Sequence, residues 1–156
     1  MGVSLGGQVA LDLIQQRPDS VDAALVSGAS IHPPDDVAQW EMPHMPTDQE
    51  WLTIMTEDVQ MMRMENAQNL QDASLSFNFE PQSSMPPVLV VIGEHDVAMA
   101  RRDFEELTTL VKSGNSRSES KVLEGAWHNH PIDVPEHFAD LIESWSRRMM
   151  ESPEAA

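Results

Sequence analysis

Short runs of consecutive apolar residues alternate along the chain with stretches in which apolar residues recur at helical spacing. The strongest run is Val-Leu-Val-Val-Ile at residues 88–92, and branched apolar side chains in succession are typical of a strand covered on both faces. Shorter runs at residues 23–27 and 121–123 predict two further strands. The pattern therefore predicts a buried sheet of about three strands.

Helical spacing predicts helices around these strands. The first helix covers residues 8–17 and ends at Pro18, since proline disfavours helical backbone in the residue before it. Another lies between the second and third strands and carries Phe104, Leu107 and Val111. The last begins near Pro135 and has one apolar stripe, formed by Phe138, Leu141, Ile142, Trp145 and Met149. Strands that alternate with helices imply an α/β fold with a parallel sheet and right-handed crossovers.

Residues 35–84 interrupt this alternation between the first two strands. Prolines break the chain up to residue 46, whereas residues 47–72 have apolar positions at helical spacing. Seven of the 11 methionines lie in the middle of the chain, between residues 42 and 85, at positions 42, 45, 55, 61, 62, 64 and 85. They form either the core face of a helix or the lining of a lid that accepts acyl chains of varied shape. We predict a helical cap or lid over residues 35–84.

Composition narrows the classes of function. A chain of 156 residues with 40% hydrophobic residues can bury one core. Nine basic against 26 acidic residues give a net charge of −17, which repels nucleic acid and anionic membrane surfaces. The absence of cysteine excludes a thiolate metal site and a cysteine nucleophile, and it fits a reducing, cytoplasmic location. No segment is apolar enough for a transmembrane span.

A glycine-rich turn opens the first helix. Residues 2–6 read Gly-Val-Ser-Leu-Gly, the pattern of a nucleophile elbow, in which a sharp strand-to-helix turn raises the serine hydroxyl between small neighbours. The same residues fit a plain tight turn, but a second glycine and an amphipathic helix follow at once, as an elbow requires. We therefore interpret Ser4 as a nucleophile and the backbone N–H of Leu5 as an oxyanion donor.

A nucleophilic serine needs a base and an acid that orients the base, and behind an elbow these follow in the order Ser, Asp or Glu, His. Asp96 comes just after the strongest strand, where open parallel sheets place functional groups. His128 comes just after the last strand, in Gly-Ala-Trp-His. We predict that Ser4, Asp96 and His128 converge at the carboxyl edge of the sheet.

These segments resemble the α/β-hydrolase family, whose C-terminal half pairs a Gly-Glu-His-Asp-like turn with a small-residue turn, a histidine and then Pro-Glu-x-Phe. Here the last element is residues 135–138. The resemblance runs from Gly2 to about Arg148, with residues 33–85 matching only as a variable cap. It implies a partial α/β-hydrolase domain over residues 1–156. It also implies a serine hydrolase that cleaves an ester, thioester, lactone or similar small acyl substrate through an acyl-enzyme on Ser4, without cofactor or metal.

Several residues have competing interpretations. Asp96 alone would fit a helix N-cap, and Glu94 is a second candidate for the acid. His95 is interpreted as structural, and His32 and His44 as solvated loop residues. A zinc site at His128 and His130 would need a third ligand, such as His137, and a spacing that places the ligands on one face, which the loop at Pro131 disfavours.

A non-catalytic fragment or binding module is the alternative function. The strands that precede the elbow in the family, with the loop that gives a second oxyanion donor, have no counterpart before Met1. Without them we expect an open edge on the strand at residues 23–27, which would favour self-association. We also expect these residues alone to hydrolyse activated esters close to the background rate, because losing one oxyanion donor costs on the order of a hundredfold to a thousandfold in turnover.

Overall fold

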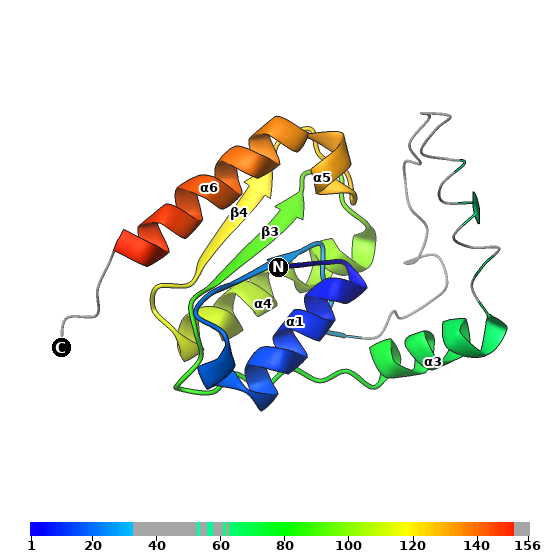
Figure 1. The fold of residues 1–156 in the computed structure, drawn as a ribbon, viewed down its shortest axis with the longest axis horizontal. Helices are drawn as coiled ribbons and strands as arrows, with labels where there is room; N and C mark the ends of the chain where they lie inside the picture. The colour runs from blue at the N-terminus through cyan, green and yellow to red at the C-terminus, as the bar shows by residue number, and fades with distance from the viewer. Residues whose placement is uncertain (33–52, 54–55, 58–60, 62, 152–156) are drawn as a thin grey trace.

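Four parallel strands form one sheet in the computed structural model, which describes residues 1–32, 53, 56–57, 61 and 63–151. The strands lie in the order β1-β2-β3-β4 (Figure 1), and their bounds are β1 Gly2–Val3, β2 Ala24–Ser27, β3 Val88–Gly93 and β4 Glu119–Leu123. The predicted parallel α/β sheet is confirmed. The two-residue β1 is the strand that the sequence pattern misses.

Part of the edge expected to be open on β2 is in fact covered. Gly2 pairs with Val26, and Val3 pairs with Ser27. Strand β3 is central, since it pairs with all four residues of β2 on one side and with β4 on the other. The register brings the carboxyl ends of all four strands to the same edge of the sheet.

The helices follow the predicted alternation. They are α1 Leu5–Gln16, the 3₁₀ turn η1 Pro18–Ser20, α3 Met64–Leu75, α4 Ala98–Gly114, α5 His130–Asp133 and α6 Pro135–Glu151. Helix α1 begins three residues before the predicted start, directly after Ser4. The short α5 was not predicted. No helix among these described residues is long and apolar enough to cross a membrane.

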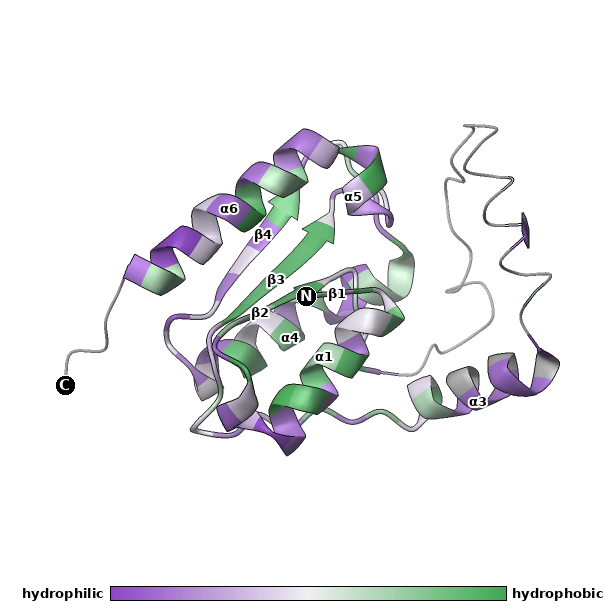
Figure 2. Ribbon diagram, in the orientation of Figure 1, coloured by the Kyte–Doolittle hydropathy of each residue, from purple (hydrophilic) through white to green (hydrophobic). Residues whose placement is uncertain are grey.

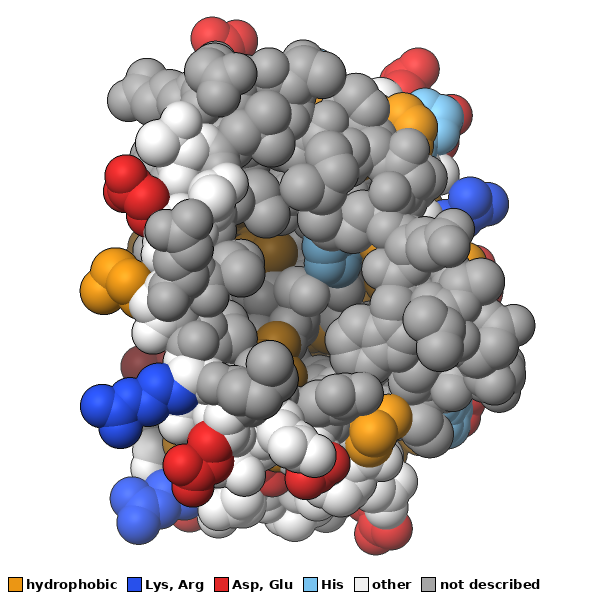
Figure 3. Space-filling model, turned by 90° about the vertical axis from the view of Figure 1, so that its right-hand side faces the viewer, with side chains coloured by type: hydrophobic (Ala, Val, Ile, Leu, Met, Phe, Trp, Pro, Cys, Tyr) orange, Lys and Arg blue, Asp and Glu red, His pale blue; other side chains and the backbone are white. Residues whose placement is uncertain are grey.

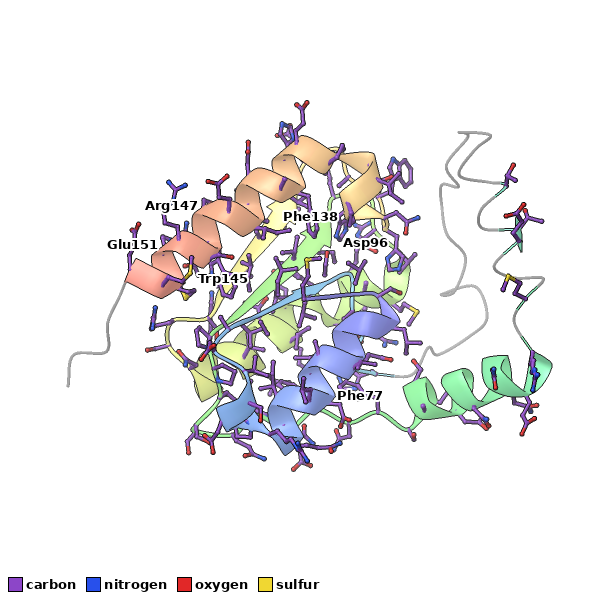
Figure 4. All side chains as sticks on the ribbon, in the orientation of Figure 1. Phe77, Asp96, Phe138, Trp145, Arg147 and Glu151 are labelled. Atoms are coloured by element: carbon purple, nitrogen blue, oxygen red, sulfur yellow. The ribbon has the colours of Figure 1, made fainter. Side chains whose placement is uncertain are left out.

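Alternate side chains of β2 and β3 fill two cores. On one face Val26, Val88 and Val90 pack against α1 and α4 through Leu11, Ile14, Leu107 and Val111. On the other face Leu25, Leu89 and Val91 pack against Phe138 and Trp145 of α6 (Figures 2 and 4). Burying each such side chain contributes about 1.5–3 kcal/mol. The prediction of strands covered on both faces is therefore confirmed for β2 and β3.

Most of the first part of the predicted cap, residues 35–62, lies outside the described residues. Within the rest of the cap, α3 is helical, as the pattern predicts up to residue 72. Of the seven methionines between residues 42 and 85, Met61 is exposed and Met85 is buried in the core that contains α1 and α4. The core interpretation therefore holds for Met85, and the lid stays a prediction.

Candidate active site

Ser4 has a backbone conformation that side chains rarely adopt. Its φ is 54° and its ψ is −123°, and it is the one non-glycine residue with positive φ in the described part of the chain. Such a conformation costs on the order of 1–3 kcal/mol and persists only where the surroundings hold it. Here the Ser4 N–H donates to the Ser27 carbonyl at 2.7 Å, and the Gly7 N–H donates to the Ser4 carbonyl at 2.8 Å. This is the strained strand-to-helix turn that an elbow requires.

Two glycines make the turn sterically feasible. A Cβ on Gly2 would lie 1.9 Å from the carbonyl oxygen of Gly6, and a Cβ on Gly7 would lie 2.7 Å from the Ala29 Cβ. A Cβ on Gly6 would meet nothing within 4 Å in the described structure. The expected need for small residues is therefore confirmed at Gly2, whereas the close approach of α1 to the sheet occurs at Gly7.

Leu5 is the first residue of α1. The N–H groups of the first helical turn have no acceptor within the helix, and the helix dipole adds partial positive charge at this end. The Leu5 N–H, directly after Ser4, therefore lies at a helix terminus suited to an oxyanion.

Asp96 is buried in the turn after β3, with 2% of its surface exposed, and Figure 4 shows it just beyond that strand. Four donors surround its carboxylate. Oδ1 accepts the Val97 N–H at 2.7 Å and contacts His128 Nδ1 at 2.6 Å. Oδ2 accepts the Gly93 N–H at 3.2 Å and contacts His130 Nε2 at 2.9 Å. Each oxygen thus has one backbone and one imidazole partner.

These contacts determine the charge of Asp96. Burial alone raises the pKa of this carboxyl, but the hydrogen bonds and charges of His128 and His130 outweigh burial and hold the pKa well below its ordinary value of 3.8. Asp96 is therefore ionised at neutral pH, and it accepts a hydrogen bond from each ring. Because Nδ1 of His128 donates to Asp96, its Nε2 is left to act as a base.

The loop after β4 places His128 against the end of β2. A Cβ on Gly93 would lie 2.3 Å from the Trp127 carbonyl oxygen, so only glycine allows this loop to approach β3 so closely. A Cβ on Gly28, whose φ is +59°, would lie 3.1 Å from the His128 ring. The His128 side chain is 13% exposed, so its ring can be reached from solvent.

Ser4 and His128 each lie against the end of β2. Ser4 is bonded to the carbonyl of Ser27, and the next residue, Gly28, lies against the His128 ring. Among the described residues, however, no hydrogen bond joins Ser4 Oγ to His128. Triad hydrogen bonds are often long before substrate binds. The structure thus pairs His128 with Asp96 and brings Ser4 to the same edge of the sheet. Figure 3 views the molecule from the right-hand side of Figure 1, the side towards which β3 and β4 point.

His130 is the residue of this site that the sequence interpretation missed. It is fully buried, and besides Asp96 it contacts the Ser27 hydroxyl through Nδ1. The only sequence signal is the His-x-His spacing, which we considered as a zinc pair. The ring instead bridges a serine and a carboxylate.

The other candidates lie apart from this network. Glu94 accepts the Gly125 N–H at 2.9 Å, and the His95 ring packs against Trp127 at a tilt of 43°, with ring centroids 4.9 Å apart. His32 pairs with Glu106 on the surface. His44 is outside the described residues. Among the residues that the structure describes, no group of three His, Cys, Asp or Glu side chains could hold a metal ion.

Comparison with known proteins places this geometry in a family. The family model described as alpha/beta hydrolase fold matches residues 1–131, while no curated protein matches the chain significantly. A carboxylesterase structure from the thaumarchaeon Nitrososphaera gargenis has a TM-score of 0.73 at 17% identity, covering 96% of this chain and 64% of that one. A putative aryl esterase from Burkholderia cenocepacia gives 0.71 at 17% identity, covering 97% and 64%.

A thermophilic esterase from Thermogutta terrifontis gives a TM-score of 0.63 at 18% identity, covering 95% of this chain and 64% of that one. The chain therefore spans a little under two thirds of the length of these structures. Since the family model matches well over half of its residues, the chain belongs to the α/β-hydrolase fold family.

Proposed function

We propose that the chain carries the catalytic residues of a serine hydrolase that cleaves carboxylic esters or related activated acyl compounds. The observation that carries this proposal is the strained backbone of Ser4 at the start of α1, on the same sheet edge as the Asp96–His128 pair. A plain turn gains nothing from a positive φ at a serine, whereas a nucleophile gains exposure of its hydroxyl.

In the proposed reaction, Ser4 Oγ attacks the acyl carbonyl carbon while its proton passes to His128 Nε2. The carbonyl oxygen becomes an oxyanion, which the Leu5 N–H and the dipole of α1 stabilise. The intermediate collapses, the bond to the leaving alcohol breaks, and that alcohol takes the proton from His128. Water then attacks the acyl-enzyme with His128 as base again, which releases the acid and restores Ser4.

Asp96 supports both half-reactions without changing its own protonation. Its ionised carboxylate holds His128 in the Nδ1–H tautomer and stabilises the imidazolium that forms after proton transfer. Ester substrates are favoured because the similar structures include a carboxylesterase and a putative aryl esterase. Some members of the family have an aspartate as the nucleophile at the elbow. A serine at position 4 argues against their reaction for this chain.

Labelling with a fluorophosphonate probe tests this proposal, because only an activated serine reacts readily with it. We expect one adduct per chain by intact mass, no adduct in Ser4→Ala, and unchanged labelling in Ser144→Ala, which removes an exposed hydroxyl on α6. Absence of labelling in the folded protein would favour the non-catalytic binding module. Labelling that survives Ser4→Ala would exclude Ser4 as the nucleophile.

A further inference from the structure

A second Ser-His-Asp arrangement lies beneath the first and shares its carboxylate. Ser27 Oγ contacts His130 Nδ1, and His130 Nε2 contacts Asp96 Oδ2 at 2.9 Å. Ser27, at the end of β2, and His130, the first residue of α5, are both fully buried. The network therefore ties β2 and α5 to the turn that carries Asp96.

Burial decides what this arrangement can do. No surface of Ser27 or His130 is open to solvent, so an acyl group cannot reach the Ser27 hydroxyl and Ser27 cannot act as a second nucleophile. Both contacts are satisfied by one neutral tautomer of His130, in which Nε2–H donates to the ionised Asp96 and Nδ1 accepts the Ser27 O–H. The ring is also packed near Phe138, at a centroid distance of 6.2 Å.

The network of Ser27 and His130 can control the orientation of the Asp96 carboxylate. A carboxylate can rotate about its last side-chain bond, which interchanges its two oxygens. The His128 contact uses Oδ1, whereas Oδ2 has His130 and one longer backbone contact, the Gly93 N–H at 3.2 Å. Removing His130 would leave Oδ2 with that contact alone and the carboxylate free to turn.

We propose that His130, held by Ser27, is a positioning residue that keeps Oδ1 of Asp96 directed at His128. This proposal rests on the proposed hydrolase function, because its effect is exerted through Asp96 on the base. The other ionisable groups around these residues act elsewhere. Asp133 of α5 accepts the Trp127 N–H, and the His95 ring packs at a tilt against the Trp127 ring.

Two amide substitutions separate the two ends of the His130 ring. In His130→Asn the side-chain amide takes the place of Nδ1, so contact with Ser27 is kept and contact with Asp96 is lost. In His130→Gln the longer amide reaches the place of Nε2 and can still donate to Asp96. A hydrogen bond to a buried carboxylate contributes more free energy than a hydrogen bond between neutral groups. We therefore expect His130→Asn to slow fluorophosphonate labelling roughly tenfold to a hundredfold, and His130→Gln to stay within about threefold of wild type.

The pH dependence of labelling provides a readout that simple core packing would not change. A carboxylate that turns away from His128 stabilises the imidazolium of that ring less well. We therefore expect the pH of half-maximal labelling to fall in His130→Asn and to stay in place in His130→Gln. Labelling rates are divided by the folded fraction of each variant, which circular dichroism measures. Equal labelling rates and equal pH midpoints in both variants would overturn the proposal.

Ser27→Ala tests the proposal if the His130→Asn variant does not fold. This variant retains both rings and removes only the hydroxyl that fixes the His130 tautomer. A loss of about twofold to tenfold in labelling rate is expected, and no loss would contradict the proposed role. Ser4→Ala distinguishes this outcome from failure of the proposed function. Continued labelling of Ser4→Ala would refute the hydrolase mechanism, whereas wild-type rates in all His130 and Ser27 variants would refute only the positioning role.

Discussion

His128 Nδ1 lies 2.6 Å from Oδ1 of Asp96, although 32 residues and two secondary-structure elements separate the two in the chain. The contact forms because β3 and β4 are parallel neighbours, so the turns after both strands lie at the same edge. A charge-assisted hydrogen bond of this length, with the carboxylate buried, fixes the imidazole in one orientation.

Asp96→Asn should remove most of the activity while nearly preserving the side-chain shape. The amide cannot accept from all four surrounding donors, so it leaves some of them unsatisfied and no longer holds His128 in the Nδ1–H tautomer. We expect fluorophosphonate labelling to slow by at least about a hundredfold. A labelling rate near that of wild type would show that His128 does not depend on this carboxylate.

Gly28→Ala should impair the site, whereas Gly125→Ala should not. Both glycines have positive φ, +59° and +70°, so both alanines carry similar backbone strain of about 1–2 kcal/mol. Only at Gly28 does the new Cβ lie 3.1 Å from the His128 ring and 3.3 Å from Asp96 Oδ2, while at Gly125 it meets nothing within 4 Å in the described structure.

The measurement is the labelling rate of each variant, together with its midpoint of urea unfolding. We expect similar midpoints for Gly28→Ala and Gly125→Ala, and a slower rate only for Gly28→Ala. Equal rates would mean that the His128 ring has freedom to move away from β2.

Asp103 provides a test of pH-dependent stability away from the site. This buried carboxylate of α4 accepts from the Ser30 hydroxyl, from the N–H groups of Ile31 and His32 at 2.8 and 2.9 Å, and from Arg102 Nε at 2.6 Å. Burial raises its pKa, but these donors outweigh burial and lower it below the ordinary value of 3.8. The stabilisation is therefore fully present above about pH 4 and is lost as pH falls towards the lower folded-state pKa.

Asp103→Asn should accordingly destabilise the protein by about 3 kcal/mol near pH 7. The difference from wild type should shrink below about pH 4, where the wild-type carboxylate begins to protonate. Urea unfolding across this pH range measures it, and Asp140→Asn, which changes an exposed carboxylate of α6, is the matched control. A destabilisation that does not vary with pH would mean that charge has no part in the Asp103 network.

The sequence predicts the elements whose signal is local. Five branched residues at 88–92 identify β3, and the apolar stripe of residues 138–149 identifies α6, because each element buries side chains in a regular period. Ser4 was predicted from its glycine-rich turn, and Asp96 and His128 were predicted from their places after strands, because parallel strands end at one edge. Strand β1 was missed because two residues show no period.

The buried contacts of His130 could not be predicted from the sequence, because both partners are distant in the chain. Ser27 lies 103 residues away and Asp96 lies 34 residues away. Nothing local distinguishes a histidine that bridges these two from a solvated one or from half of a metal site. Ser27 ends an apolar strand, and a polar residue buried there is meaningful only once its partner is known.

The central claim is that Ser4 forms an acyl-enzyme, and trapping that intermediate tests it most directly. The purified protein is mixed with p-nitrophenyl butyrate, quenched in acid and digested, and the butyryl group is located by mass spectrometry. The account predicts butyrylation of Ser4, less of it in His128→Ala and none on this peptide in Ser4→Ala. Butyrylation of another residue in its place, or no butyrylation of Ser4 in the folded protein, would contradict it.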